Sequence, residues 1–335
     1  MKILVTGGTG YIGSNVAVQL LESGYDVIVL DSLSNSKSSV VERIKRITRK
    51  NLTFFKGDIR DKSLLDGIFK KNTIHAVMHF AGLKSVADSE TNPLDYYATN
   101  VAGTVTLIES MLFANVKKII FSSSATVYGD NGLIEHSETS PLNPINVYGK
   151  TKFIVEGMLK EIRSGNPSFT YAALRYFNPV GAHCSGLLGE DPKNKPNNLM
   201  PILANVATGR QKELSIYGND YNTPDGTCLR DYIHVTDLAA GHIAALEKII
   251  QTKTTLTVNL GTGKPHSVRE LIKTFELVSG KKITFKYAQR RKGDLDQYFA
   301  NPNEAERVLA WTAKLDLFRM CEDVWRWQQL QQSGL

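Results

Sequence analysis

The stretch "TGGTGYIG" at residues 6–13 decides the fold of this chain, because it joins a strand-like segment to an expected helix. Gly7, Gly10 and Gly13 are spaced by three. This spacing is typical of a tight turn that brings the backbone close to a pyrophosphate and lets the helix pack on the strand. The helix N-terminus then offers unpaired N–H groups and a positive dipole end to the anion. The stretch therefore predicts a dinucleotide-binding βα unit.

Strands and helices alternate outward from this turn. The segments rich in Val, Ile and Phe read as strands and lack clean alternation, which is typical of strands buried on both faces; they lie at 2–7, 26–31, 52–58, 75–82, 117–123 and 170–177. Helical candidates lie between them, roughly at 11–23, 37–48, 61–71, 92–115 and 147–164. We therefore expect an α/β fold with a Rossmann-type doubly wound parallel sheet.

The pattern changes after about residue 178. Residues 177–201 are rich in Gly, Pro and Asn and are expected to be mostly loop. Shorter elements of both kinds follow, with strands at 214–218, 256–261 and 283–288 and helices at 235–250 and 267–279. We expect a dinucleotide-binding domain over 1–177 and a smaller mixed α/β C-terminal substrate domain over 178–335, some of whose segments return to the first lobe. A ligand cleft between two lobes is the usual arrangement.

Composition excludes several classes of function. The net charge of +7 comes from 40 basic and 33 acidic residues, and the densest basic run, at 43–50, resembles a solvated helix face with no nucleic-acid motif beside it. Cys184, Cys228 and Cys321 form neither a metal spacing nor a disulfide framework. The chain opens on a strand-like segment, not a signal peptide, and no apolar run approaches the ~18 residues of a membrane span. We expect a cytoplasmic protein without a metal, a nucleic-acid partner or a membrane partner.

An acidic residue ends the second expected strand. Asp31 lies 21 residues beyond Gly10, where a carboxylate binds the adenosine ribose hydroxyls of a dinucleotide. A carboxylate there would repel a 2′-phosphate, and Lys37 is a weak substitute for the arginine that such a phosphate would need. We therefore predict NAD as the cofactor, in preference to NADP.

The ends of the third and fourth strands offer further cofactor contacts. Asp58 and Ile59 would flank the adenine, although Asp58 also suits a turn or helix cap. Ala81 and Gly82 would let the backbone approach the ligand. Lys84 would reach a ribose or a phosphate, and a plain surface lysine is the alternative.

The stretch "NVYGKTK" at 146–152 places Tyr148 and Lys152 on one helix face, in line with the apolar Val155 and Leu159. A lysine buried there must have a partner. A phenol with a pKa near 10 must drop by ~3 units to act as a base near pH 7. A nearby ammonium and the cationic nicotinamide ring of NAD⁺ both favour the phenolate. The pair is thus a candidate base and its helper.

A run of serines supplies a hydroxyl near this pair. Ser124 is the last serine of "FSSSATVYG" (121–129), at the C-terminal end of a strand, where ligands bind in such folds. A hydroxyl donor there would orient the phenol. The alternative is a turn or N-cap serine, which is a common use of this residue.

Together, the glycine turn, Asp31, the serine run and the Tyr-x-x-x-Lys pair resemble the extended short-chain dehydrogenase/reductase family. The segments "FAGLKSV", "LRYFNPVGAH", "PNNLMP", "DGTCLRDYIHVTDLA" and "RRKGDL" extend the resemblance over nearly the whole chain to the branch that epimerises UDP-hexoses at C4. The resemblance implies a bound NAD that is regenerated in each cycle and a transient 4-keto sugar between UDP-galactose and UDP-glucose. It also implies homodimers paired through helices of the first lobe, for which 92–115 and 147–164 are the candidates.

Catalytic and binding roles follow from the same resemblance. Tyr148 is the base, Ser124 its hydrogen-bonding partner, and Lys152 binds the nicotinamide ribose and lowers the pKa of the tyrosine. The positions implied for the cofactor are Gly7, Gly10, Tyr11, Ile12, Gly13, Asp31, Asn35, Asp58, Ile59, Phe80, Ala81, Gly82, Lys84, Asn100, Ser122, Tyr148, Lys152 and Phe177. One departure is Thr99, where relatives often have the first of two adjacent asparagines, so a cofactor contact from that position is in question.

The substrate positions lie mostly in the second half of the chain. They are Ser124, Tyr148, Asn178, Asn198, Leu199, Tyr217, Arg230, Arg291, Asp294 and Tyr298. Arg230 and Arg291 would each grip the diphosphate with a planar fork, and a surface ion pair is the alternative for either one. Tyr298 matches the position that limits the space beside the sugar 2-substituent, so we expect N-acetylated sugars to be disfavoured.

Three other functions share parts of this pattern. A nucleotide-sugar 4,6-dehydratase has Asp-Glu soon after the serine or threonine of this strand, whereas Ala125 and Thr126 follow Ser124 here. A UDP-glucuronate decarboxylase needs extra contacts to the sugar carboxylate, for which no motif is found. A catalytically inactive NAD-sensing protein would be expected to lose the Tyr/Lys pair, which this chain keeps.

Overall fold

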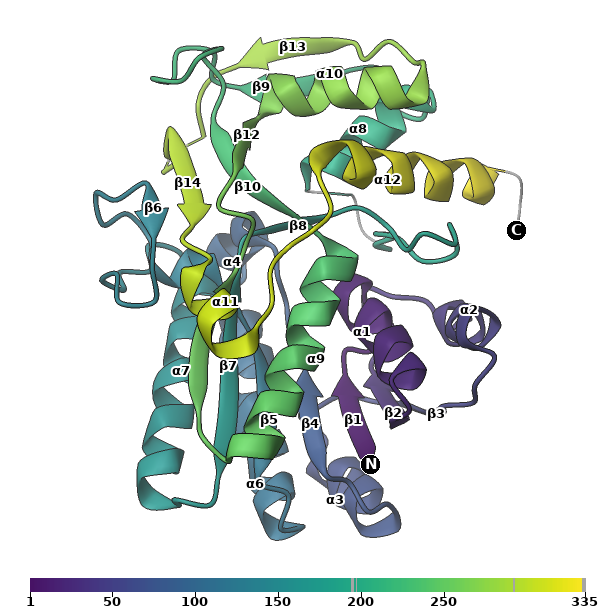
Figure 1. Ribbon diagram of the computed structural model, residues 1–335, viewed down its shortest axis with the longest axis vertical. Helices are drawn as coiled ribbons and strands as arrows, with labels where there is room; N and C mark the ends of the chain where they lie inside the picture. Colours follow the sequence, from purple (N-terminus) through teal and green to yellow (C-terminus); the bar gives the residue numbers. More distant parts are fainter. Residues whose placement is uncertain (194–195, 197, 292, 333–335) are drawn as a thin grey trace.

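A seven-stranded parallel sheet forms the centre of the larger lobe of the computed structural model, which describes residues 1–193, 196, 198–291 and 293–332 (Figure 1). The strand order is β11-β7-β5-β4-β1-β2-β3. Their bounds are β1 (Lys2–Thr6), β2 (Asp26–Asp31), β3 (Thr53–Lys56), β4 (Ala76–His79), β5 (Lys118–Ser124), β7 (Thr170–Tyr176) and β11 (Leu256–Leu260). The expected doubly wound parallel sheet is confirmed.

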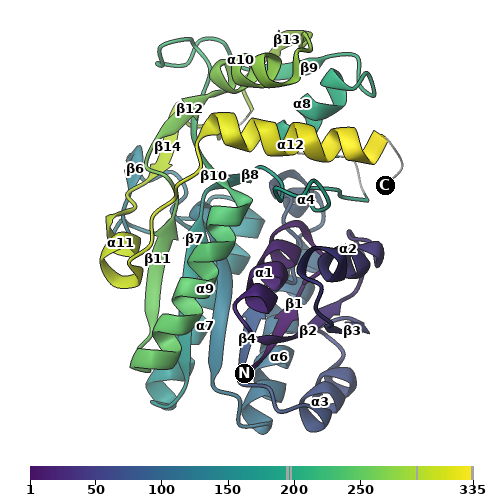
Figure 2. The same cartoon turned by 45° about the vertical axis from the view of Figure 1, so that its right-hand side comes forward.

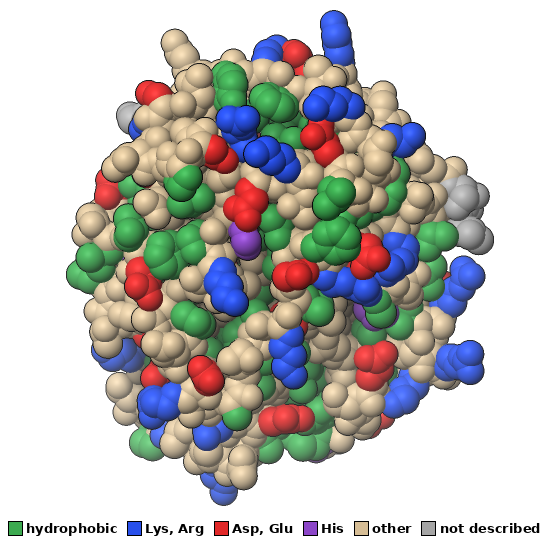
Figure 3. Space-filling view, turned by 45° about the horizontal axis from the view of Figure 1, so that its top comes forward, with side chains coloured by type: hydrophobic (Ala, Val, Ile, Leu, Met, Phe, Trp, Pro, Cys, Tyr) green, Lys and Arg blue, Asp and Glu red, His purple; other side chains and the backbone are tan. Residues whose placement is uncertain are grey.

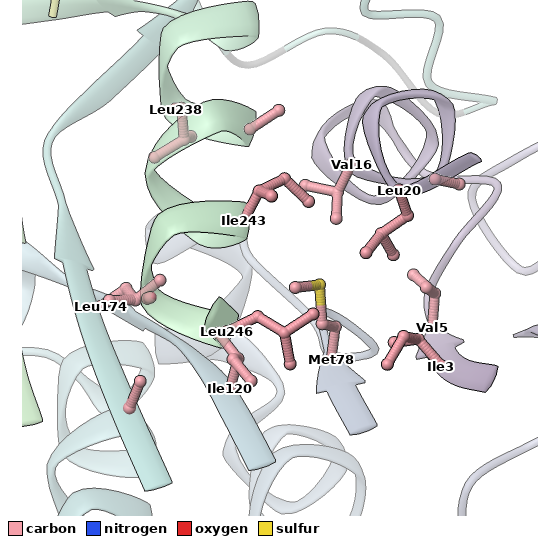
Figure 4. Packing of buried hydrophobic residues seen from close by; sticks show 14 of the residues in the cluster. Ile3, Val5, Val16, Leu20, Met78, Ile120, Leu174, Leu238, Ile243 and Leu246 are labelled. Carbon is pink, nitrogen blue, oxygen red and sulfur yellow. The ribbon is translucent and has the colours of Figure 1, made fainter. Parts of the chain in front are cut away.

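Helices cover both faces of this sheet (Figures 1 and 2). One face carries α1 (Tyr11–Glu22), α2 (Ser39–Thr48) and α9 (Val235–Thr252), and the other carries α3 (Lys62–Lys71), α6 (Gly103–Phe113) and α7 (Val147–Gly165). Figure 4 shows the first layer of packing, in which Val16 and Leu20 of α1 and Leu246 of α9 point at strand side chains such as Val5 and Met78. This burial explains why the strands are apolar on both faces.

The helical region expected at 92–115 is confirmed, with an irregularity at its centre. It consists of α5 (Pro93–Tyr96), a π-helical segment η1 (Tyr97–Ala102) and then α6, and a short helix α4 (Val86–Thr91) precedes it. Asn92 separates α4 from α5, as expected for a residue before proline. π-Helical turns often occur at functional sites, and this one carries Thr99.

Two elements from the second half of the chain, a strand and a long helix, belong to the larger lobe. β11 pairs in parallel with β7, from Leu256 opposite Ala172 to Leu260 opposite Tyr176. α9 packs on α1 over the same sheet (Figure 2). The division of the chain at residues 177 and 178 stays a prediction.

In the part of the chain that the structure describes, the smaller lobe is built from short strands and three helices (Figure 1). A mixed sheet has the order β12-β10-β14-β6, with β8 also paired to β10, and β13 pairs with β9 in a separate ribbon. The strands are β6 (Glu135–His136), β8 (Asn178–Val180), β9 (Leu214–Tyr217), β10 (Leu229–His234), β12 (Pro265–Ser267), β13 (Phe285–Ala288) and β14 (Gln297–Ala300). Its helices are α8 (Leu199–Ala207), α10 (Val268–Ser279) and α12 (Leu317–Gln332), whereas α11 (Asn303–Leu309) packs on β11 and α9 of the larger lobe.

The loop expected at 177–201 contains β8 and the beginning of α8, and its residues 194–195 and 197 lie outside the described residues. Among the described residues, no helix is long and apolar enough to cross a membrane. The same residues hold no group of three or more potential metal ligands. On the face drawn in Figure 3, acidic and basic side chains are interspersed and form no field of a single sign.

Candidate active site

A cavity of about 360 Å³ lies at the carboxyl ends of the parallel strands. The glycine turn and Asp31 line one part of it, and Ser124, Tyr148 and Lys152 line another. Segments from the second half of the chain, including Asn178 and Asn198, complete its wall. The turn and the Tyr/Lys pair, far apart in sequence, thus face one continuous space.

The glycine turn is tight for the reason expected from its sequence. Gly7 has a φ of +70°, and a Cβ there would lie 2.6 Å from the backbone nitrogen of Ala81. A Cβ on Gly13 would lie 2.3 Å from the carbonyl oxygen of Gly7. Only glycine lets the turn, the helix and the end of β4 approach this closely. The close approach leaves the cavity edge lined by backbone at the N-terminus of α1, which suits a pyrophosphate.

Asp31 is fixed at the rim of this cavity. One carboxylate oxygen accepts from the backbone nitrogen of Leu33 at 2.8 Å and from the hydroxyl of Ser36 at 3.0 Å. The other accepts from the backbone nitrogen of Thr9 at 3.1 Å. A charged, oriented carboxylate beside the phosphate turn fits the ribose hydroxyls of a dinucleotide.

Tyr148 and Lys152 lie on the buried face of α7, with exposures of 8% and 6%. The Nζ of Lys152 lies 5.7 Å from the centre of the Tyr148 ring and donates to the carbonyl oxygen of Ser122 at 2.8 Å. The helix begins at this point because Asn146 caps it, its side chain accepting from the backbone nitrogen of Gly149 at 2.7 Å. The expectation that the pair faces inward is confirmed.

The surroundings of Tyr148 and Lys152 shift the pKa values of both side chains strongly. Burial raises the pKa of Tyr148 to about 12, and the neighbouring Ser124 hydroxyl offsets part of that rise. Burial lowers the pKa of Lys152 to about 8, and the charge of Glu156 opposes the fall. Desolvation therefore outweighs the help that the phenol receives from the side chains around it.

Ser124 has two local roles. Its side chain accepts from the backbone nitrogen of Thr126 at 3.2 Å and from the Thr126 hydroxyl at 3.0 Å, which caps the short 3₁₀ helix η2 (Ala125–Val127). It also lines the cavity beside Tyr148. The capping interpretation and the interpretation as a partner of the phenol are thus compatible.

Asn100 supports the cavity wall from behind. Its side chain accepts from the backbone nitrogen of Leu83 at 2.8 Å and donates to the carbonyl oxygen of Leu83 at 2.9 Å. It also donates to the hydroxyl of Thr151 on α7 at 3.1 Å. Asn100 is not among the described residues that line the cavity, whereas Thr99, the position that departs from relatives, does line it.

Two of the residues predicted to bind the cofactor form ion pairs within the protein. Asp58 pairs with Arg60 at 2.7 Å, and this hydrogen bond holds the pKa of the Asp58 carboxyl below its usual value. Lys84 pairs with Glu190 at 2.7 Å, and the same carboxylate accepts from the side-chain amide of Asn198 at 2.7 Å. Glu190 thus links a residue of the larger lobe to the N-cap of α8.

The predicted substrate residues of the smaller lobe lie in pairs. The Arg230 guanidinium lies 3.5 Å from Asp294, and its Nη1 donates to the carbonyl oxygen of Leu295 at 2.8 Å. The guanidinium carbon of Arg291 lies 3.9 Å from the centre of the Tyr217 ring. Arg230 is also the register partner of Tyr298 across β10 and β14.

Tyr298 connects the smaller lobe to the residue that follows the serine segment, Ser122–Ser124. Its hydroxyl donates to the carbonyl oxygen of Ala125 at 2.6 Å. Its ring lies 4.3 Å from the buried His136 ring and 5.8 Å from Phe177, a cavity-lining residue. The side chain is thereby held on three sides.

Most of the sequence-predicted positions line the same cavity. They are Gly7, Gly10, Tyr11, Ile12, Gly13, Asp31, Asn35, Asp58, Ile59, Phe80, Ala81, Gly82, Lys84, Ser122, Ser124, Tyr148, Lys152, Phe177, Asn178 and Asn198. Those not among its described lining residues are Asn100, Leu199, Tyr217, Arg230, Arg291, Asp294 and Tyr298. Their assignment to the substrate or the cofactor stays a prediction.

Sequence reasoning missed two carboxylates close to these residues. Glu156 is buried beside Lys152, and its position four residues further along the same helix was the available signal. Glu190 lies in a segment expected to be loop, and no local pattern connects it to Lys84 or Asn198. Only the folded chain brings these groups together.

Comparison with known proteins places this arrangement among relatives. The family model described as GDP-mannose 4,6 dehydratase matches residues 4–324. A protein of Bacillus subtilis named UDP-glucose 4-epimerase is 51% identical over 334 residues, which cover 100% of this chain and 98% of that protein.

Two solved structures resemble the whole chain. The UDP-glucose-4-epimerase of Stenotrophomonas maltophila with bound NAD and formylated UDP-arabinopyranose has a TM-score of 0.96 and 45% identity, and the similarity covers 100% of both chains. The UDP-glucose 4-epimerase of Bifidobacterium longum in complex with NAD⁺ and UDP has a TM-score of 0.95 and 44% identity, again covering 100% of both chains.

Proposed function

This chain belongs to the UDP-glucose 4-epimerases of the extended short-chain dehydrogenase/reductase family, and we propose that it interconverts UDP-galactose and UDP-glucose by reversible, NAD-dependent inversion at C4. The observation that carries this proposal is that Tyr148, Lys152 and Ser124 share one cavity with the glycine turn and Asp31. A phenol that can take a hydroxyl proton therefore faces the same space as a dinucleotide site.

The residues present fit NAD. The turn at Gly7 and Gly13 lets a pyrophosphate approach the backbone, and Asp31 offers an oriented carboxylate for the ribose hydroxyls. The same carboxylate opposes a 2′-phosphate, which favours NAD over NADP. Bound by these residues, NAD would supply the acceptor for the C4 hydride and, once reduced, the donor that returns it.

Tyr148 takes the proton of the sugar 4-hydroxyl as the C4 hydride leaves, and returns it when the 4-keto sugar is reduced. A phenol whose pKa burial raises to about 12 needs nearby positive charge to do this near neutral pH. Lys152 provides one such charge. Its hydrogen bond to the carbonyl oxygen of Ser122 holds the ammonium beside the Tyr148 ring. The Ser124 hydroxyl orients the phenol and the substrate oxygen.

The UDP-hexose would extend from this pair toward the smaller lobe. Asn178 and Asn198 line the cavity and would bind sugar hydroxyls and phosphate. Arg230 and Arg291 would bind the diphosphate, since a guanidinium fork matches phosphate oxygens. Leu199, Tyr217 and Asp294 would hold the uridine, and Tyr298 would border the sugar.

The family model is described as a 4,6-dehydratase, an activity that differs from epimerisation in the groups it needs. A 4,6-dehydratase needs an acid and a base next to the serine of β5. Ala125 and Thr126 stand there instead; the Ala125 carbonyl bonds Tyr298 and the Thr126 hydroxyl bonds Ser124. Loss of the sugar 6-hydroxyl therefore has no proton donor at this position.

The proposed enzyme is a cytoplasmic homodimer. A homodimer would form through α6 and α7, on which Val105, Phe153 and Ile154 are exposed by 37%, 41% and 40%. Apolar side chains on adjacent helices are typical of such an interface. A cytoplasmic enzyme with a dinucleotide-binding domain over 1–177 and a UDP-sugar-binding domain over 178–335 accords with this assignment.

Incubation of the purified protein with UDP-galactose and NAD tests the function. We expect UDP-glucose to accumulate to an equilibrium mixture with no net consumption of NAD. Tyr148→Phe should lower kcat by a factor of about 10² to 10⁴, the usual contribution of a general base, and should keep NAD bound. Tyr171→Phe, a buried tyrosine on the same layer, is the control. Absence of UDP-glucose would contradict the function, and full activity of Tyr148→Phe would contradict the base.

A further inference from the structure

The buried face of α7 carries a third polar group after the catalytic pair. Tyr148, Lys152 and Glu156 follow one another at four-residue intervals and are exposed by 8%, 6% and 9%. Side chains at this spacing lie above one another on one helix face. A carboxylate at this depth is costly unless charged or hydrogen-bonding groups compensate it.

Glu156 is compensated by two partners on adjacent strands. One of its oxygens accepts from the Ser123 hydroxyl at 2.5 Å and from the Arg175 Nε at 3.0 Å. The other accepts from the Arg175 Nη2 at 2.6 Å. Ser123 and Arg175 are register partners of β5 and β7, so both side chains point to the same side of the sheet. Glu156 thus fixes α7 to both β5 and β7.

The contact of Glu156 with Ser123 lies at the centre of the serine segment (Ser122–Ser124). Ser123 stands between Ser122, whose carbonyl oxygen holds the Lys152 ammonium at 2.8 Å, and Ser124, whose hydroxyl lies beside the Tyr148 phenol. A shift of α7 along β5 would change both distances together. The Glu156 contact to Ser123 therefore fixes the register in which the helix presents the pair to the strand.

The charge of Glu156 also acts on Lys152. The ammonium is surrounded by the Tyr148 ring from its own helix, the Phe121 ring of β5 at 4.9 Å, and His79 of β4, whose pKa burial and Lys152 together lower to about 3. On β7, Arg175 is bound to Glu156, and the Tyr176 hydroxyl is hydrogen-bonded to that of Ser122. Among the described residues, Glu156 is the carboxylate whose charge opposes the loss of the Lys152 proton.

We propose that Glu156 is a positioning residue of the epimerase reaction, which binds Ser123 and Arg175 to hold α7 in register with β5 and keeps Lys152 charged beside Tyr148. This inference rests on the function proposed above. Glu156 contacts neither substrate nor cofactor and acts only through Lys152 and the serine segment. A purely structural ion pair is the competing explanation, and it predicts lower stability without a change in the titration of the catalytic pair.

Two variants separate these explanations. Glu156→Gln keeps the shape and the contact to Ser123 but removes the charge, and it leaves the buried Arg175 without its ion-pair partner, which destabilises proteins. Glu156→Gln combined with Arg175→Met removes both charges and relieves that cost. Asp323→Asn is the matched control, because Asp323 is a carboxylate exposed by only 1% that pairs with Arg319 and Arg326 on α12, away from the catalytic pair.

The first measurement is the pH profile of kcat with UDP-galactose. In both Glu156 variants, we expect the alkaline limb of kcat to move to lower pH and kcat above neutral pH to fall by about tenfold, the change that corresponds to one pKa unit. KM should stay within about twofold, since no substrate contact is lost. Asp323→Asn should lose stability and keep the wild-type profile. Unchanged profiles in both Glu156 variants would overturn the inference.

The second measurement does not depend on turnover. The ultraviolet absorbance of the Tyr148 phenolate, taken as the difference between each NAD-saturated protein and its Tyr148→Phe counterpart, gives the titration midpoint of the phenol. Removing the Glu156 charge should raise this midpoint, because a less charged Lys152 favours the phenolate less. An unmoved midpoint contradicts the inference. A raised midpoint in a protein without epimerase activity would contradict the proposed function alone.

Discussion

The phenolic oxygen of Tyr298 lies 2.6 Å from the carbonyl oxygen of Ala125, the residue that directly follows Ser124. This bond joins β14 of the smaller lobe to the end of β5 in the larger lobe. The Tyr298 ring also packs against His136 and Phe177. The side chain is therefore held in place by one hydrogen bond and two ring contacts, and we propose that it forms a wall beside the sugar.

Replacing this wall should change sugar selectivity. Tyr298→Cys removes the ring, and we expect the ratio of kcat/KM for UDP-N-acetylgalactosamine to that for UDP-galactose to rise by about tenfold or more, as for other steric changes in a pocket. Tyr298→Phe, which keeps the ring and loses only the bond to Ala125, is the control and should keep the wild-type ratio. Equal efficiency of the wild-type protein toward both sugars would contradict the role of Tyr298 as a wall.

Asp31 should determine cofactor affinity. Asp31→Asn keeps the shape but removes the charge that three protein donors share and that we propose for binding a ribose, and hydrogen bonds to a charged group contribute about 1.5–3 kcal/mol each. We expect NAD to bind about tenfold more weakly or worse, measured by calorimetry on protein stripped of cofactor. Asp26→Asn, at the exposed beginning of the same strand, is the control and should leave NAD affinity unchanged.

The stability contribution of Lys152 should depend on pH in a direction that follows from its pKa. Burial lowers this pKa from 10.5 to about 8, so the unfolded chain binds the proton more tightly than the folded one. Between these values the unfolded state holds more protons, and the stability of the wild-type protein rises with pH. Lys152→Met lacks this titration.

We therefore expect the free energy of unfolding of Lys152→Met, minus that of the wild type, to be about 3 kcal/mol smaller at about pH 10.5 than at about pH 7. Urea unfolding of both proteins at the two pH values measures the difference. A difference that stays constant with pH would show that Lys152 titrates normally in the folded protein.

The helical segments were predictable because their signals are local. The spacing of Tyr148, Lys152, Val155 and Leu159 defines one buried face within a single helix, and α7 has that face. The glycine turn and Asp31 likewise depend on one βα unit and the strand beside it.

The contacts that join distant segments were not predictable. Glu156 and Arg175 meet only because β5 and β7 are neighbours in the sheet. Glu190 meets Lys84 only because the loop after β8 comes to the segment that follows β4. The short strands β6, β8, β10, β12 and β14 pair across large sequence distances, and strands of two to six residues carry too little periodicity to be recognised alone.

The exposed apolar side chains of α7 should determine assembly. Phe153→Glu combined with Ile154→Glu places two charges on the proposed dimer surface, and we expect a homodimer to become a monomer. Light scattering coupled to size exclusion measures the mass. Leu277→Glu on α10, where Leu277 is exposed by 75%, is the control for an added surface charge. A wild-type protein that is monomeric at micromolar concentration would contradict the proposed assembly.

The position of β11 has a consequence for synthesis of the chain on the ribosome. β7 is complete at Tyr176, yet its outer edge is covered only when β11 has been made up to Leu260. In the interval, the growing polypeptide presents an unpaired apolar strand edge, which is a site of aggregation. The larger lobe therefore closes late in translation, after β8, β9 and β10 of the smaller lobe have already been made. Truncations that end before β11 should accumulate as insoluble material.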